Sequence, residues 1–285
     1  MNFEQKRMFY RRSLRLAINK VGVDLRMFSA SKRALPEFLV AGVQKAGTTS
    51  LYATLIQHPN IYPTMDKKEI HYWDNPKNYK RGLRWYRAHF PLINDLKLAS
   101  AITGEKTPNY LEKPDFIVKI KADLPSVKLI ILLRNPIERT ISNYFMIKKR
   151  GNEELSLMEA LLNEEARLAN PQEYKKFGTE RAYKIRSVYA PSIKACMEHF
   201  PPGQILILDS KKFFNAPTVV LNETFDYLGL PPFQLPITNI HKNLGSYKKD
   251  EISQDVYTYL THYFRRHNEE LYSLLGFDFG WDSRL

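Results

Sequence analysis

The clearest hydrophobic pattern in the chain is a short apolar run that turns through glycines into an amphipathic helix. Residues 38–43 have the length of a strand, and Leu51 and Leu55 fall on one side of the helix that follows. The chain turns through Gly42 and Gly47. Converging backbone N–H groups and the positive end of a helix dipole bind anions, so this stretch predicts a phosphate-binding turn.

Other stretches extend the pattern of alternating strands and helices. Residues 127–133 are an almost continuous run of apolar residues, which is typical of a strand at the centre of a parallel sheet. Shorter strands are predicted at 101–106 and 204–209. Helical periodicity is predicted at 79–91, 153–167, 189–200, 216–228 and 256–275.

The glycine turn has an unusual distribution of polar residues. Gly42 and Gly47 have the G-x-x-x-x-G spacing of a triphosphate-binding loop, but Thr48 stands where that signature has its lysine. Lys45 lies inside the loop instead. This arrangement predicts a nucleotide with a short 5′ anion rather than ATP with Mg²⁺. Three hydroxyl donors follow the second glycine: Thr48, Thr49 and Ser50.

An acid and an imidazole follow two residues apart. Glu69 and His71 point to the same side of an extended chain, which makes them a candidate general-base pair. The alternative is an ordinary surface pair. Lys106 ends the strand at 101–106, where an open α/β sheet places ligand groups, although a turn lysine is the alternative there.

The strand at 127–133 ends in a second candidate phosphate site. Arg134 stands at its carboxyl end, Pro136 can open the next helix, and Ser142 follows about two turns into that helix. An arginine fork with a hydroxyl group suits a terminal phosphate dianion. The alternative is a salt bridge between Arg134 and Glu138.

Composition limits the class of protein. The 285 residues, 44% of them hydrophobic, suit one α/β domain with appendages and argue against disorder. A formal charge of +13 indicates an anionic partner, such as a nucleotide, an acidic glycan, a membrane face or nucleic acid. The single cysteine, Cys196, excludes an internal disulfide or a cysteine-built zinc site and suits a reducing compartment.

The N-terminal part differs from the rest of the sequence. We expect residues 1–35 to form a basic helical arm and residues 36–285 to form a single domain that begins at Pro36. The arm's function could be contact of residues 2–35 with an anionic membrane surface, and the alternative is packing on its own domain or on a neighbour. No window reaches the roughly 18 apolar residues of a membrane span, and no secretory h-region is present, which predicts a cytoplasmic protein.

Three motifs, in this order, resemble those of sulfotransferases that use 3′-phosphoadenosine 5′-phosphosulfate (PAPS). They are G-x-x-K-x-G-T-[ST]-[ST]-L at 42–51, Glu-[Ile/Val]-x-[Phe/Tyr]-[Phe/Trp]-[Asp/Asn] at 69–74 and Arg-[Asp/Asn]-Pro-x-[Asp/Glu]-Arg-x-x-Ser at 134–142. The first motif is most similar to the heparan sulfate N- and 3-O-sulfotransferase branch, in a soluble, bacterial-type form. The resemblance implies an α/β, P-loop-like fold with a central parallel β-sheet flanked by helices.

The resemblance also implies roles for individual residues. Glu69 would be the catalytic base, His71 would orient it, and Lys45 and Lys106 would stabilise the leaving and transferred groups. Arg134 and Ser142 would hold the 3′-phosphate of PAPS. The 5′-phosphosulfate would lie on the loop residues Gln44, Lys45, Ala46, Gly47, Thr48, Thr49 and Ser50.

The C-terminal part departs from that branch. Its cysteine-bridged nucleotide-covering loop is reduced here to residues 240–249, where Lys242 and Gly245 are candidates to cap PAPS. The expected reaction moves a sulfuryl group from PAPS to a hydroxyl or amine, with PAP as product and no metal. A carbohydrate acceptor is favoured, and a small alcohol, a phenol or a peptide tyrosine is the alternative. A small-molecule P-loop kinase and a non-catalytic module that binds anionic polymers are alternatives from other classes. No nucleic-acid partner is expected.

Overall fold

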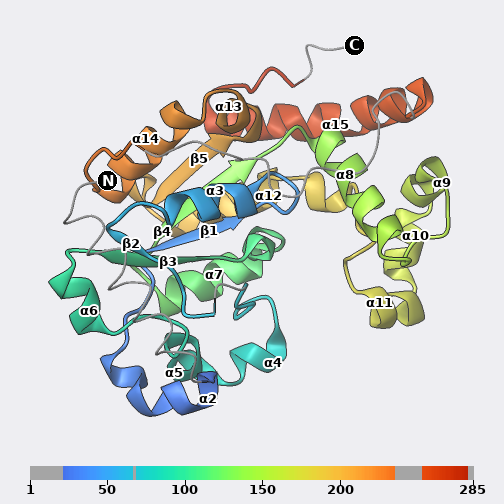
Figure 1. The fold of residues 1–285 in the computed structure, drawn as a ribbon. Helices are drawn as coiled ribbons and strands as arrows, with labels where there is room; N and C mark the ends of the chain where they lie inside the picture. The colour runs from blue at the N-terminus through green and yellow to red at the C-terminus, as the bar shows by residue number, and fades with distance from the viewer. Residues whose placement is uncertain (1–21, 67–68, 235–251, 282–285) are drawn as a thin grey trace.

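A five-stranded parallel sheet forms the centre of the protein. The computed structural model describes residues 22–66, 69–234 and 252–281 (Figure 1). The strand order is β2-β3-β1-β4-β5, and every pair in it is parallel. The strands are β1 (Phe38–Gly42), β2 (Ile61–Tyr62), β3 (Ile102–Lys106), β4 (Lys128–Leu133) and β5 (Ile205–Asp209). The predicted α/β class with a central parallel sheet is confirmed.

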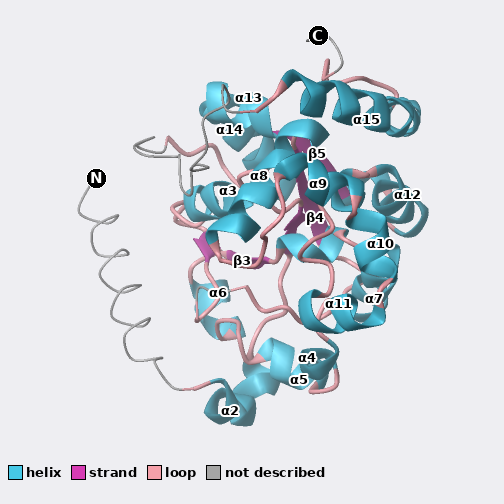
Figure 2. Ribbon diagram, turned by 90° about the vertical axis from the view of Figure 1, so that its right-hand side faces the viewer, coloured by secondary structure: helices cyan, strands magenta, loops and turns pink. Residues whose placement is uncertain are grey.

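Helices cover both faces of the sheet, as the two views at right angles show (Figures 1 and 2). All five residues of β1 are buried, as expected for a central strand covered on both faces. The α-helices are α2 (Val23–Arg26), α3 (Thr48–Leu55), α4 (Pro76–Tyr79), α5 (Gly82–Arg87), α6 (Ile93–Leu98), α7 (Pro114–Asp123), α8 (Pro136–Lys149), α9 (Leu157–Leu162), α10 (Glu164–Ala169), α11 (Pro171–Phe177), α12 (Ala190–His199), α13 (Ser210–Asn215), α14 (Pro217–Leu228) and α15 (Gln254–Leu275). Short 3-10 helices are η1 (Met27–Lys32), η2 (Pro108–Leu111), η3 (Ile185–Ser187) and η4 (Pro202–Gln204).

Two of the predicted helices are interrupted. The helix expected at 79–91 is replaced by the separate helices α4 and α5, because Gly82, the first residue of α5, adopts a left-handed φ of 76°. The helix expected at 153–167 starts later, at the Ser156 capping box, and breaks at Asn163 into α9 and α10. Figure 1 shows α9, α10 and α11 gathered to one side of the sheet.

Part of the expected N-terminal arm packs on the domain. The described residues 23–32 form α2 and η1, and η1 contacts both α2 and α5. Arg26 is only 3% exposed; its Nε donates to the carbonyl of Ala88, and its Nη2 pairs with Asp66 at 2.5 Å. Arg33 is also buried and donates to the carbonyl of Phe90. These two arginines therefore hold the segment in place and do not belong to a solvated basic face. The basic helix expected before Gly22 lies outside the described residues.

Candidate active site

Three side chains hold the carbonyl groups of the glycine loop that follows β1. The carbonyl oxygens of residues 44–46 accept, in order, from Arg139 Nε at 3.1 Å, Arg134 Nη1 at 2.9 Å and Ser210 Oγ at 2.6 Å. Arg139 lies on α8, Arg134 directly after β4 and Ser210 at the start of α13. The donors fix the orientation of three consecutive peptide groups. A loop held in this way is preorganised for a ligand.

The loop leads directly into the N-terminus of α3. Gly47 occupies the N-cap with a left-handed φ of 101°, and the helix begins at Thr48. The first N–H groups of a helix have no partner within the helix and carry the positive end of its dipole. Thr48 and Ser50 are buried at this end, whereas Thr49 is half-buried. The geometry is that of an anion site at the edge of the sheet where the strands end.

Replacing Gly47 with Ala is expected to destabilise the fold by on the order of 2 kcal/mol or more, because an L-residue there is strained and its Cβ has no room. That Cβ would stand 2.6 Å from the ring of Phe214. Gly229→Ala is the matched control, since its φ is 74° but no atom lies within 4 Å of the new Cβ. Urea unfolding should show the larger loss for Gly47→Ala. Equal losses for both variants would contradict the steric part of this explanation.

Positive charge is concentrated around the loop. Burial, with contributions from Arg134, Arg139 and Arg150, lowers the pKa of Lys45. Burial, and then Arg186, lowers the pKa of Arg139 to about 9. Because these buried cations repel one another, they create a positive potential at the loop. An anionic ligand that binds there reduces the repulsion.

A continuous chain of polar contacts connects the loop with the predicted acid–base pair. Asp74 Oδ2 lies 2.6 Å from His71 Nδ1, and His71 Nε2 lies 3.1 Å from Glu69 Oε2. The other Glu69 oxygen accepts from Lys106 Nζ, which also lies 3.1 Å from Thr49 Oγ1. Five side chains thus link the segment at 69–74 to the first turn of α3.

These contacts set the charge of each member. Burial raises the pKa of Glu69, but the hydrogen bonds from His71 and Lys106 outweigh burial and bring this pKa down to about 2. The hydrogen bond to Asp74, with a second one to Glu69, raises the pKa of His71 to about 10. At neutral pH the site therefore holds an ionised Glu69 that two cations contact. Its side chain is 31% exposed, so an acceptor can reach it.

The backbone behind this pair differs from the prediction. We expected Glu69 and His71 to meet because they share one side of an extended chain. Residues 69–74 instead form a loop, in which His71 has a left-handed φ of 52°. The two side chains meet because of that turn, and the strand interpretation was wrong.

The phosphate residues predicted after β4 lie as expected along the chain. Pro136 opens α8, and Ser142 is buried on it, 5% exposed. Arg134 also pairs with Glu138 at 3.1 Å, so the salt bridge considered as its alternative is present. Its other contact, to the carbonyl of Lys45, places the guanidinium beside the glycine loop as well. The remaining candidates, Lys242 and Gly245, lie outside the described residues.

Sequence reasoning missed several residues of the site. Arg139 and Asp74 were noticed only as matches to motifs, and Ser210 carried no signal at all. Arg139 follows Arg134 by five residues in a helix that starts at Pro136, which is a spacing that does not by itself predict burial. Only the fold brings Ser210, more than 160 residues away in the chain, to the loop.

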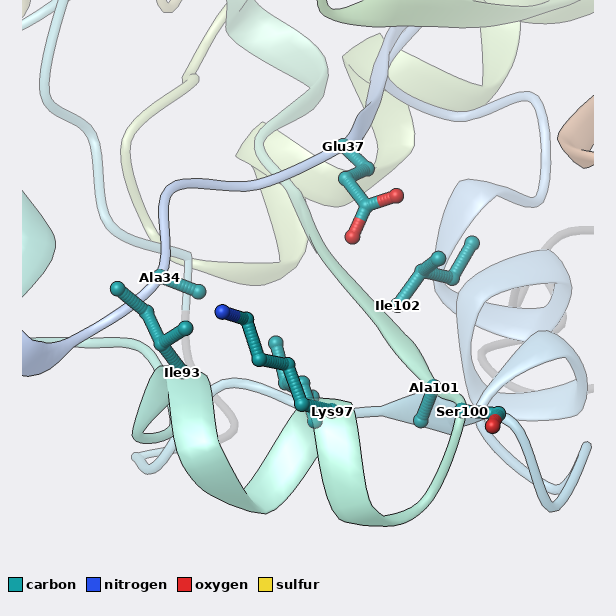
Figure 3. Close-up of a pocket in the computed structure, with 8 residues that line it drawn as sticks. Ala34, Glu37, Ile93, Lys97, Ser100, Ala101 and Ile102 are labelled. Carbon is teal, nitrogen blue, oxygen red and sulfur yellow. The ribbon is translucent and has the colours of Figure 1, made fainter.

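A separate pocket lies at the opposite edge of the sheet, where β1 and β3 begin. Its volume is about 330 Å³, and Glu37 and Lys97 are its charged residues (Figure 3). Glu37 directly precedes β1, whereas the glycine loop follows that strand. The complete lining is Ala34, Glu37, Ile93, Leu96, Lys97, Ser100, Ala101 and Ile102. None of the predicted site residues lines it.

The site combines three features: the glycine loop after β1, an acid–base pair and an arginine at the end of β4. Together they define a nucleotide-dependent group-transfer enzyme of α/β fold. Comparison with known proteins defines the family. The model of the sulfotransferase domain matches residues 35–273, and the chain belongs to that family. The predicted family and the predicted enzyme class, a sulfotransferase, are confirmed. The kinase and polymer-binding alternatives are therefore dropped.

Several relatives carry informative names. The chain is 30% identical over 280 residues to heparan sulfate glucosamine 3-O-sulfotransferase 3B1 of Mus musculus, covering 89% of this chain and 66% of that protein. It is 29% identical over 267 residues to the human bifunctional heparan sulfate N-deacetylase/N-sulfotransferase 3, covering 85% of this chain and 30% of that protein. A solved sulfotransferase from Alicyclobacillus acidocaldarius superposes with a TM-score of 0.68 at 26% identity, covering 88% of this chain and all of that one.

Two further properties of the described residues bear on the predictions. None of their helices is both long and apolar enough to cross a membrane. No group of three or more histidine, cysteine, aspartate or glutamate side chains in the described ranges is arranged to hold a metal ion.

Proposed function

We propose that this chain transfers a sulfuryl group from PAPS to a hydroxyl or amine group of a carbohydrate. The observation that carries the proposal is the polar chain from Asp74 to Thr49, because it joins an acid–base pair to an anion-binding loop. The names of the heparan sulfate relatives support the acceptor class. A small alcohol, a phenol or a peptide tyrosine remains the alternative acceptor.

The loop residues fit the anionic part of PAPS. Held carbonyl groups, a left-handed Gly47 and the start of α3 provide a preorganised cradle for the 5′-phosphosulfate. Arg134 and Ser142 would hold the 3′-phosphate, Lys242 and Gly245 are proposed to cap the nucleotide, and bound PAPS would supply the activated sulfuryl group.

The chain's own residues would then perform the proton and charge work. Glu69 accepts the proton of the acceptor hydroxyl or amine as its oxygen or nitrogen forms a bond to sulfur. Lys45 offsets the negative charge that the broken sulfur–oxygen bond leaves on the phosphate, and Lys106 stabilises the group in transfer. His71 keeps Glu69 oriented, supported by Asp74. These are positioning and electrostatic roles.

The first test is a calorimetric titration with PAP, with ATP and AMP as controls. We expect tight binding of PAP, because the two proposed phosphate sites are separate, and weaker binding of AMP, which lacks the 3′-phosphate. Preference for ATP, or no binding of PAP, would overturn the proposed donor.

The acceptor is tested by transfer from radiolabelled PAPS. Heparan-type oligosaccharides that contain glucosamine should be labelled, and a simple phenol should not. Labelling of the phenol alone would overturn the carbohydrate proposal and leave the donor intact. The cytoplasmic location and the membrane contact of residues 2–35 stay predictions.

A further inference from the structure

A fully buried carboxylate lies directly beneath the proposed active site. Glu105, on β3 next to Lys106, has no exposed surface. Tyr86 and Tyr110 donate their hydroxyl protons to its Oε1 at 2.9 and 2.8 Å, and Thr107 donates to its Oε2 at 2.7 Å. Within the described ranges no cation forms an ion pair with it. The three hydroxyl groups are its hydrogen-bond donors.

Two of the three hydroxyl groups also hold the loop that carries the acid–base pair. Thr107 Oγ1 accepts from the backbone N–H of Ile70 at 3.2 Å, and Tyr110 Oη accepts from that of Tyr72 at 3.1 Å. A backbone N–H can only donate, so each hydroxyl oxygen must accept from the loop and pass its own proton to an acceptor. Glu105 is that acceptor for both.

The opposite side of the loop is held as well. Asn78 Nδ2 donates to the carbonyl oxygens of Ile70 and His71 at 3.1 and 2.9 Å. The backbone between Glu69 and Tyr72 is thus fixed from two sides, in a segment where His71 has the unfavourable left-handed conformation. Such a conformation persists only where surrounding contacts determine it.

We propose that Glu105 is a positioning residue for sulfuryl transfer: through Tyr110 and Thr107 it orients the backbone of residues 70–72 and so places Glu69 and His71. This inference rests on the proposed function, because that function makes Glu69 the base. Glu105 itself touches neither substrate.

The shifted pKa of Glu105 agrees with this role. Burial raises its pKa to about 7, although the three hydroxyl groups oppose the shift. A buried carboxylate without a cation is unfavourable for stability, and such groups gather where function requires them.

The chain offers a matched pair of variants. Tyr86 and Tyr110 are both fully buried, both donate to the same oxygen of Glu105, and both rings pack on Trp73. Of these two tyrosines, only Tyr110 has a hydroxyl group that reaches the loop backbone among the described contacts. We expect Tyr110→Phe to lower kcat by on the order of 10- to 100-fold with little change in PAP affinity, because displacement of a catalytic group has effects of this size. Tyr86→Phe should stay within about 3-fold of the wild type.

Equal losses of kcat in the two variants would show a merely structural hydrogen bond and overturn the proposal. Thr107→Val is a second variant with the same expectation, to be used if Tyr110→Phe folds poorly. A loss that appears only in PAP affinity would also overturn it, because the proposal concerns the base and not the donor loop.

A readout independent of activity separates this inference from the proposed function. The pKa of His71, about 10, depends on its contacts with Asp74 and Glu69. In an NMR titration of the histidine ring protons, Tyr110→Phe or Thr107→Val should lower this pKa towards the ordinary value of about 6.5. Tyr86→Phe should leave it unchanged. If the pKa of His71 is the same in all variants, the positioning role is overturned. If the wild type fails to bind PAP, only the proposed function is overturned.

Discussion

Replacing Glu69 with Gln is expected to lower kcat by about 10²- to 10⁴-fold, which is the usual contribution of a general base. The amide has nearly the same shape and can still accept a hydrogen bond from Lys106, but it cannot take up a proton. It also turns an acceptor of His71 into a donor at one of the two oxygen positions. Initial rates of transfer from PAPS at saturating acceptor measure the effect.

Glu69→Gln should keep its donor affinity or gain some, because no phosphate contact is lost and the neutral amide competes less strongly for the ammonium group of Lys106. Glu37→Gln is the matched control: it makes the same chemical change at the opposite end of β1, beside the pocket of Figure 3, and should leave kcat unaltered. Full turnover in Glu69→Gln would show that another group is the base.

Replacing Arg134 with Ala is expected to weaken PAP binding by roughly 10- to 100-fold, which corresponds to the loss of a hydrogen bond from a charged donor. The geometry allows two causes. The guanidinium holds the loop carbonyl of Lys45 at 2.9 Å, and it is the proposed partner of the 3′-phosphate. Calorimetry with both PAP and AMP distinguishes them, because AMP lacks that phosphate.

If Arg134 binds the 3′-phosphate, Arg134→Ala loses affinity for PAP and keeps its affinity for AMP. If it acts only through the loop, both affinities fall by the same factor. Arg134→Lys keeps the charge but not the planar fork, and it should recover only part of the loss. Unchanged PAP binding in Arg134→Ala would refute both explanations.

The fold was predictable because its strongest signals are local. β1 and β4 are nearly continuous apolar runs, so their burial in a parallel sheet follows from the sequence alone. Helix boundaries were less certain, because one glycine conformation separates α4 from α5.

Some members of the candidate site were predictable, but their connections were not. Glu69, His71 and Lys106 were found from motifs, but the link from Lys106 to Thr49 joins residues 57 positions apart. The role proposed for Glu105 gave no signal in the sequence, since a glutamate in a strand is ordinarily exposed. Contacts of this kind depend on which strands are neighbours, and the sheet order β3-β1-β4 decides that.

The shared contact of Lys106 has a kinetic consequence. In the ligand-free protein Lys106 donates to Glu69, whose pKa is about 2, so an acceptor that arrives first meets a carboxylate too weakly basic to take its proton. On the proposed function, an anionic donor bound beside Thr49 would compete for the same ammonium group and, by drawing it away, would make Glu69 more basic. Productive turnover should therefore follow a compulsory order in which the nucleotide enters before the acceptor and leaves after the sulfated product.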